Sequence, residues 1–131
     1  MKLMIDLNVI MDIITGRKEF ANDSIKVCNL DAHKYFLSAH MVTTASYLSR
    51  KLSRERAEQA LDLILGDDFS IVPCDRKILL AARKFGFADF EDAVVAASAE
   101  KARCQYIITR NPRDFAGSPV PALTPAEFLT L

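Results

Sequence analysis

The 131-residue sequence lacks an excess of charge of either sign, because 17 lysines and arginines are balanced by 17 aspartates and glutamates. Proteins that bind nucleic acid through their overall charge normally carry a strong basic excess. The balance therefore argues against binding by bulk attraction, and a nucleic-acid role would require charges that are segregated on the surface. Most aromatic residues are phenylalanines at positions typical of a core, so they indicate no platform for base stacking.

Cysteines and long hydrophobic runs are also scarce. The three cysteines are widely spaced and form no CxxC pair, which favours free thiols in a reducing compartment over disulfides or a zinc site. No apolar run reaches the roughly 18 residues of a membrane span, and Asp6 interrupts the N-terminus too early for a signal peptide. We therefore expect a cytoplasmic protein with no membrane partner. Without a repeat or linker, residues 1–131 are expected to form a single domain.

Short apolar segments alternate with helical patterns along the chain. The apolar runs that predict strands are residues 2–5, 35–38, 70–73, 105–109 and a short run from Val120. Between them lie helical patterns, the first capped by Asn8 and ended near Gly16, and the longest running from Asp89 to Arg103. A capping box at Thr124 begins a last helix. This alternation predicts an α/β three-layer sandwich with a central, mainly parallel sheet of about five strands.

Acidic and amide residues follow the predicted strands or begin a helix. Asp6 ends the first strand, Asp89 and Asp92 open the longest helix, and Asn111 and Asp114 follow the strand at 105–109. In a parallel sheet these positions share one rim. Several carboxylates at one cleft repel one another unless a hard cation lies between them, and Mg²⁺ or Mn²⁺ suits such oxygen ligands. The sequence therefore predicts a divalent metal site.

Each of the four aspartates also has a purely structural explanation. Asp89 and Asp92 stand where an N-cap and a first-turn acid belong. Asp6 can accept amide hydrogens at the start of the next helix, and Asp114 can be a turn residue. Only their convergence at one rim favours the functional interpretation.

The motifs around these residues resemble those of the PIN domain family, magnesium-dependent nucleases that include the VapC-type toxins of bacterial toxin–antitoxin pairs. The run MIDLNVIMDII resembles the family's D-x-N-V-[IL]-x-D opening, and SAHMVTTASYLSRK resembles its second strand and following helix. The run DFEDAVVAASAEKARCQYIITRNPRDF resembles the most recognisable block of the family, and PVPALTPAEFL resembles its C-terminal end. The resemblance covers most of the chain and implies a PIN-like endoribonuclease.

Carried over by position, the resemblance implies a catalytic metal site. Asp6 and Asp92 match acidic metal ligands, Asp114 is the nearby carboxylate that completes the site, and Asn111 stands where many relatives have aspartate. Asp12 matches a common acid of the family one helical turn below Asn8, and the alternative is that it only caps a helix or faces solvent. The residues expected to orient ligands or water are Asn8, Thr44, Asp89 and Thr109.

The sequence departs from the family pattern at one acidic position. PIN nucleases usually carry a glutamate early in the helix after the second strand, but here that helix reads MVTTASY from residue 41. Thr44 is the best match for the missing glutamate, and Thr43 is the other candidate. Because a hydroxyl gives a metal less charge, two hypotheses stay open: an active Mg²⁺- or Mn²⁺-dependent endoribonuclease, and a catalytically weakened PIN-like RNA-binding module.

Basic residues near the predicted rim are candidate RNA contacts. Arg110 and Arg113 bracket Asn111, and Arg50 and Lys51 end the helix after the second strand. Further basic candidates are Arg17, Lys18 and Arg54. His33 and His40 show no metal-ligand spacing and are interpreted as incidental. The resemblance also implies an antitoxin protein as partner and a homodimer.

A third hypothesis is a signalling domain that accepts a phosphoryl group on aspartate. Such domains need an acidic pair near the first strand and a lysine at the end of a late strand. Here Thr109 ends the late strand and Arg110 follows it, so the pattern disfavours this class.

Overall fold

The computed structural model describes residues 1–17 and 19–131, and the basic candidate Lys18 lies outside them. Five parallel strands form one sheet in the order β3-β2-β1-β4-β5. They are β1 (Lys2–Ile5), β2 (Lys34–Ser38), β3 (Phe69–Val72), β4 (Tyr106–Ile108) and β5 (Ala122–Leu123). The predicted parallel sheet is confirmed, although the last strand begins at Ala122 and not at Val120.

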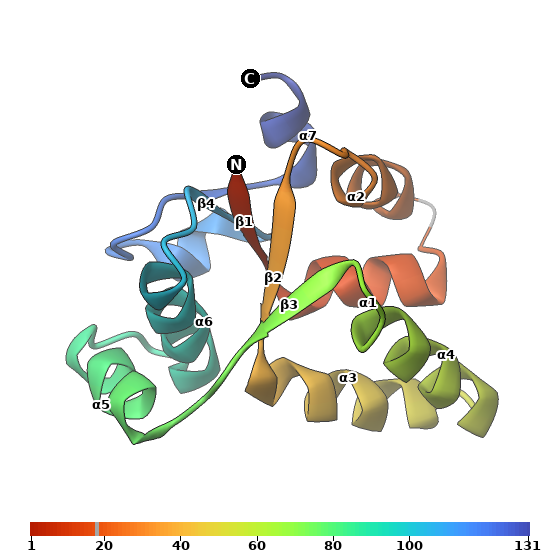
Figure 1. The fold of residues 1–131 in the computed structure, drawn as a ribbon, viewed down its shortest axis with the longest axis horizontal. Helices are drawn as coiled ribbons and strands as arrows, with labels where there is room; N and C mark the ends of the chain where they lie inside the picture. The colour runs from red at the N-terminus through yellow and green to blue at the C-terminus, as the bar shows by residue number, and fades with distance from the viewer. Residues whose placement is uncertain (18) are drawn as a thin grey trace.

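Helices cover both faces of this sheet, as Figure 1 shows. One side carries α1 (Leu7–Thr15), α2 (Ala21–Cys28), α3 (Ala39–Arg50) and α4 (Arg54–Ile64). The other side carries α5 (Arg76–Lys84) and α6 (Phe90–Lys101). A 3₁₀ turn, η1 (Pro112–Phe115), links β4 to β5, and α7 (Pro125–Leu129) ends the fold. The predicted α/β three-layer sandwich is therefore confirmed.

The two helical layers explain why the central strands are apolar throughout. Leu3, Met4 and Ile5 of β1 have no solvent-exposed surface, and neither do Ile107 and Ile108 of β4. Strands buried on both faces need continuous apolar runs, because neither set of alternating side chains meets water. Asp6, which follows β1 directly, is buried by the same layers and therefore needs polar partners.

The first helix begins two residues earlier than the sequence predicted. Asp6, not Asn8, is the N-cap of α1: its backbone is extended, and its Oδ1 accepts a hydrogen bond from the Leu7 amide at 2.9 Å. The prediction of Asn8 as the cap was wrong because the side chain of Asn8 bonds across the sheet to the segment after β4. The helix ends at Gly16 as predicted, with the left-handed φ of 66° that glycine adopts without strain.

The strand order reverses between β1 and β4, which places a topological switch point at the centre of the sheet. Chain segments diverge there at the carboxyl ends of the strands, and ligands of open α/β sheets bind in the resulting crevice. Cys28, Cys74 and Cys104 are free thiols as predicted, with Cys104 buried and the other two half-buried. Within the described ranges, no helix has the length and apolar character needed to cross a membrane.

Candidate active site

Asp6 lies at the switch point and is almost completely buried, with 7% of its surface exposed. Strand pairing sets Ile5 beside Ile108, and the Asp6 amide donates to the Ile108 carbonyl at 2.9 Å. The Asp6 side chain therefore emerges beside Thr109, the first residue after β4. Burial raises the pKa of Asp6, while the hydrogen bonds from Thr109 and Leu7 act in the opposite direction.

Thr109 anchors the Asp6 carboxylate. Its hydroxyl, also fully buried, donates to Asp6 Oδ2 at 2.8 Å. The Oγ1 of Thr109 itself accepts hydrogen bonds from Asn8 Nδ2 at 3.3 Å and from the Asn111 amide at 3.2 Å. The Asn8 carbonyl oxygen in turn accepts from the Arg110 amide at 3.1 Å. The predicted orienting residues Asn8 and Thr109 thus form one network that fixes Asp6.

Asp92 lies beside the same cavity as Asp6 but belongs to α6, in the other helical layer. Asp89 caps α6 by accepting a hydrogen bond from the Glu91 amide at 2.8 Å, and Asp92 lies in the first turn. Asp6 and Asp92 both line a cavity of about 160 Å³. The sequence prediction that these two residues converge at the sheet rim agrees with this arrangement.

Burial and several negative charges near Asp92 raise the pKa of its carboxyl group. Burial first, and then the charges of Asp89, Asp6, Asp114 and Glu91 in that order, raise the pKa of Asp92 to about 7. Asp114 and Asp89 also push the pKa of Asp6 upward. A carboxyl group in such surroundings is stabilised by a proton or by a bound cation.

Four further polar residues line the Asp6–Asp92 cavity: Asn8, His40, Thr44 and Glu91. Thr44 lines the cavity while Thr43 is exposed, so of these two residues Thr44 is the one whose side chain could face a cation held there. Its hydroxyl donates to the His40 carbonyl at 3.2 Å.

The sequence interpretation missed His40 and Glu91. His40 was set aside because it lacks metal-ligand spacing, yet its ring Nδ1 lies 2.8 Å from the Ser38 hydroxyl at the end of β2, and the ring lines the cavity. Burial lowers the pKa of His40, which favours its neutral form. Glu91 is adjacent to Asp92, and the acidic first turn of α6 was the one signal that pointed to it.

The donor set of this cavity fits a hard divalent cation. Mg²⁺ keeps several of its waters and commonly takes only one or two protein carboxylates, which Asp6 and Asp92 supply. Across residues 1–17 and 19–131, no three His, Cys, Asp or Glu side chains are grouped closely enough to enclose a metal. Asp114 is exposed on η1 and does not line the cavity, but its charge raises the pKa of both Asp6 and Asp92.

Asn111 and the basic candidates are distributed unevenly around this cavity. Asn111 and Arg113 are exposed in the segment that follows Thr109. Arg50 and Lys51 lie at the far end of α3, whose 12 residues extend roughly 18 Å from the rim. The structure therefore does not bring those two residues to the Asp6–Asp92 cavity.

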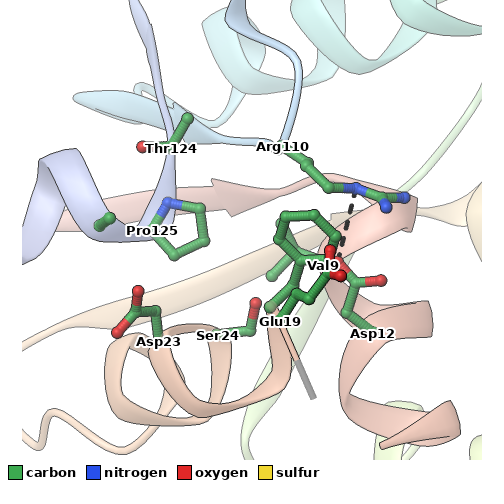
Figure 2. Close-up of a pocket in the computed structure, with 10 residues that line it drawn as sticks. Val9, Asp12, Glu19, Asp23, Ser24, Arg110, Thr124 and Pro125 are labelled. Carbon is green, nitrogen blue, oxygen red and sulfur yellow. Dashed lines mark ion pairs between the residues drawn. The ribbon is translucent and has the colours of Figure 1, made fainter. Parts of the chain in front are cut away.

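Arg110 does not line the Asp6–Asp92 cavity but lines another one, which Figure 2 shows. Its Nε lies 3.6 Å from Asp12 Oδ2, and its guanidinium carbon lies 4.7 Å from the centre of the Phe20 ring. Asp12 is only 3% exposed and is not a cap residue of α1, so the alternative that it only caps a helix or faces solvent is wrong. It is buried because it lies on the covered side of α1, where its carboxylate contacts the Arg110 guanidinium.

Comparisons with known proteins give a consistent result. The family model for the PIN domain matches residues 2–113. A chain of VapBC2 from Rickettsia felis, solved bound to a DNA fragment from its promoter, has a TM-score of 0.72 at 15% identity, covering 95% of this chain and 98% of that chain. VapC20 of Mycobacterium tuberculosis, described as a sarcin-ricin loop cleaving toxin, has a TM-score of 0.75 at 13% identity, covering 87% and 93%.

A toxin–antitoxin complex from Klebsiella pneumoniae has a TM-score of 0.69 at 24% identity, covering 94% of this chain and 97% of that chain. At these identities the likeness to solved structures shows the fold. No curated protein matches the sequence.

Proposed function

Because this chain belongs to the PIN domain family, we propose that it is a Mg²⁺- or Mn²⁺-dependent endoribonuclease. The observation that carries the proposal is the convergence of Asp6 and Asp92, from β1 and α6, on one cavity at the switch point. The pKa of Asp92, raised to about 7, supports it, because this carboxyl group lies among like charges that a cation would offset.

In this proposal Asp6 and Asp92 hold the cation, and Asp114 or Asn111 completes the site directly or through water. A divalent cation bound there supplies a water of lowered pKa and offsets charge on the scissile phosphate. Thr109 and the Leu7 amide hold the Asp6 carboxylate in one orientation. Asp89 fixes the first turn of α6 and so the position of Asp92.

The basic residues have separate parts in RNA binding. Arg113 is exposed beside Asn111 and is the best placed to contact a phosphate near the cavity. Arg110 holds its guanidinium on Asp12 and Phe20 and positions Asn8 through its amide. Arg50 and Lys51 would contact only RNA that extends along α3.

Single-stranded RNA cleavage in the presence of Mn²⁺ tests the nuclease. We expect the wild type to cleave, and Asp6→Asn to lose at least about a hundredfold of that rate, since removing a metal's own ligand costs at least as much as removing an outer partner. Asp62→Asn, an exposed acid on α4, is the matched control and should cleave like wild type. Wild-type cleavage no greater than that of Asp6→Asn would overturn the enzyme proposal.

The second candidate function is a catalytically weakened RNA-binding module. It is favoured by Thr44, which lines the cavity at the place where the family usually has glutamate. A protein that binds RNA but shows no metal-dependent turnover would support this candidate over the nuclease.

We also propose that the protein acts in the cytoplasm as a homodimeric toxin silenced by an antitoxin. The support is the shared fold with chains from toxin–antitoxin complexes. Growth arrest on expression, relieved by the product of a short neighbouring gene, is the expected result. Analytical ultracentrifugation of the purified chain reports its oligomeric state. Normal growth at high expression of wild type would count against the toxin role.

A further inference from the structure

A second cavity, of about 270 Å³, lies between α1, α2, α7 and the segment after β4 (Figure 2). None of Asp6, Asp92 and Asp114 lines it, and the proposed nuclease does not use it. Its walls contain two buried polar side chains, Asp12 and Ser24, which come from α1 and α2.

Both of these side chains carry an atom without a hydrogen-bond partner. Ser24 is 0% exposed and its Oγ is unpartnered, and Asp12 is 3% exposed with its Oδ2 unpartnered. The Nε of Arg110, 3.6 Å from that Oδ2, is also without a hydrogen bond, so the ion pair satisfies neither atom. Unsatisfied buried polar atoms are costly and uncommon. Two buried oxygens at the wall of a cavity favour a ligand that donates hydrogen bonds.

The charges around the cavity favour a cationic ligand. Among the described residues, three carboxylates line it, those of Asp12, Glu19 and Asp23, together with the guanidinium of Arg110. The charges of Arg110 and Arg17 both act on Asp12, which leaves Glu19 and Asp23 as the less compensated acids. Arg110 is already engaged over the Phe20 ring, where the Arg17 guanidinium also lies, 5.8 Å from the ring centre. In Figure 2, Asp12 and Asp23 stand on opposite sides of the cavity, so negative charge is available at both ends.

The space between the two acids is apolar and small. Val9 and Pro125 line it together with Ala126, which is exposed on α7. The volume lies just below the roughly 300–1,000 Å³ of cavities that take drug-sized ligands. A short alkyl chain fits such walls, and an ammonium group, a compact charge with three donors, suits single acceptor atoms better than a planar guanidinium.

We propose that this cavity binds a small linear diamine, with one ammonium on Asp12 and Ser24 and the other on Asp23. The alkyl chain would lie against Val9 and Pro125. The proposal concerns binding and is independent of RNA cleavage, so it stands or fails separately from the nuclease.

Calorimetric titration of the full chain with 1,4-diaminobutane, at constant ionic strength, tests the proposal. We expect saturable binding to wild type and at least about tenfold weaker binding of butylamine, which has one ammonium. Asp23→Asn should weaken diamine binding at least about tenfold, and Ala126→Leu, which fills the cavity from an exposed position, should abolish it. Asp62→Asn, an exposed acid outside the cavity, should bind like wild type.

Amide chemical shifts locate the ligand and separate this cavity from the acidic one. Shifts at Ser24 and Ala126 that are absent for Asp6 and Asp92 support the proposal. Absence of binding, shifts confined to Asp6 and Asp92, or unchanged binding in both Asp23→Asn and Ala126→Leu would overturn it. Asp12→Asn is more direct but leaves Arg110 without its ion-pair partner, so the other two variants decide the matter if it does not fold.

Discussion

The carboxyl group of Asp92 illustrates what a single residue gains from its surroundings. In the sequence it is a first-turn acid, which helix capping alone explains. In the folded chain its pKa rises to about 7, first through burial and then through four neighbouring carboxylates. This perturbation distinguishes it from an ordinary first-turn residue and marks it as a functional candidate.

The raised pKa of Asp92 predicts a pH dependence of stability in the metal-free protein. Between the unfolded pKa near 3.8 and the folded value of about 7, the folded state keeps a proton that the unfolded state has lost. The free energy of unfolding therefore falls as the pH rises through this window. Asp92→Asn removes the contribution of this group, and we expect the variant to be more stable than wild type at pH 8 in EDTA by about 1–2 kcal/mol, allowing for screening of a partly exposed group.

Urea unfolding of both proteins at several pH values between 4 and 8 measures this difference. Asp6 has its pKa raised too, so a fall of the free energy of unfolding with rising pH is expected to persist in the variant. Addition of Mn²⁺ should stabilise the wild type and not Asp92→Asn. If the free energy of unfolding of the two proteins in EDTA changed equally with pH, the assigned environment of Asp92 would be contradicted.

Thr44 offers the opposite experiment, in which a charge is added. Thr44→Glu places a carboxylate in the Asp6–Asp92 cavity, so we expect Mn²⁺ affinity to rise about tenfold and RNA cleavage to increase. Thr43→Glu adds the same charge at the exposed neighbouring position and is the control. Equal Mn²⁺ affinities in the two variants, measured by calorimetry, would show that Thr44 does not face the metal.

Among the elements, α6 determines whether the two acids meet. Its residues from Ala93 to Ala99 are all buried. Val95, Ala96 and Ala99 pack into the core at the sheet, while Ala93, Val94 and Ala97 pack with Ile78 and Ala82 of α5. A helix that is buried on both sides needs small side chains to approach the strands closely. This spacing sets how far Asp92 lies from Asp6.

Ala96→Leu tests this role of α6. Ala96 is fully buried one turn after Asp92, so the larger side chain must displace the helix from the sheet, at a cost of about 1–3 kcal/mol. We expect a lower melting temperature and weaker Mn²⁺ binding. Glu100→Leu makes a similar change at an exposed position of the same helix and should change neither. If Ala96→Leu were destabilised but bound Mn²⁺ with wild-type affinity, the packing of α6 would not determine the geometry of the metal site.

For the whole molecule, the formal charge of zero has a consequence for RNA binding. Non-specific affinity for nucleic acid comes mainly from neutralised phosphates, and this chain has no overall positive field. We expect weak binding of single-stranded RNA in EDTA, and binding at least about tenfold tighter with Ca²⁺ present, because the cation joins the acidic cavity to a phosphate. Fluorescence anisotropy measures both affinities. Tight RNA binding in EDTA would contradict this view of the site.

Sequence alone determined the features that depend on near neighbours. The apolar runs of β1 and β4, the capping box at Thr124 and the acidic start of α6 are local patterns, and the structure contains all of them. The strand–helix alternation was enough to predict a parallel sheet, and the rule about its carboxyl ends was enough to select Asp6 and Asp92. Motif resemblance added the family.

Only the tertiary structure decided the features that depend on residues distant in sequence. The bond from Thr109 to Asp6 joins residues 103 positions apart, and it exists because β1 and β4 are neighbours at the switch point. The pairing of Arg110 with Asp12 and the placement of His40 beside the acids have the same origin. Burial and desolvation of these groups follow from how the helices cover the sheet, and local patterns carry no information about that packing.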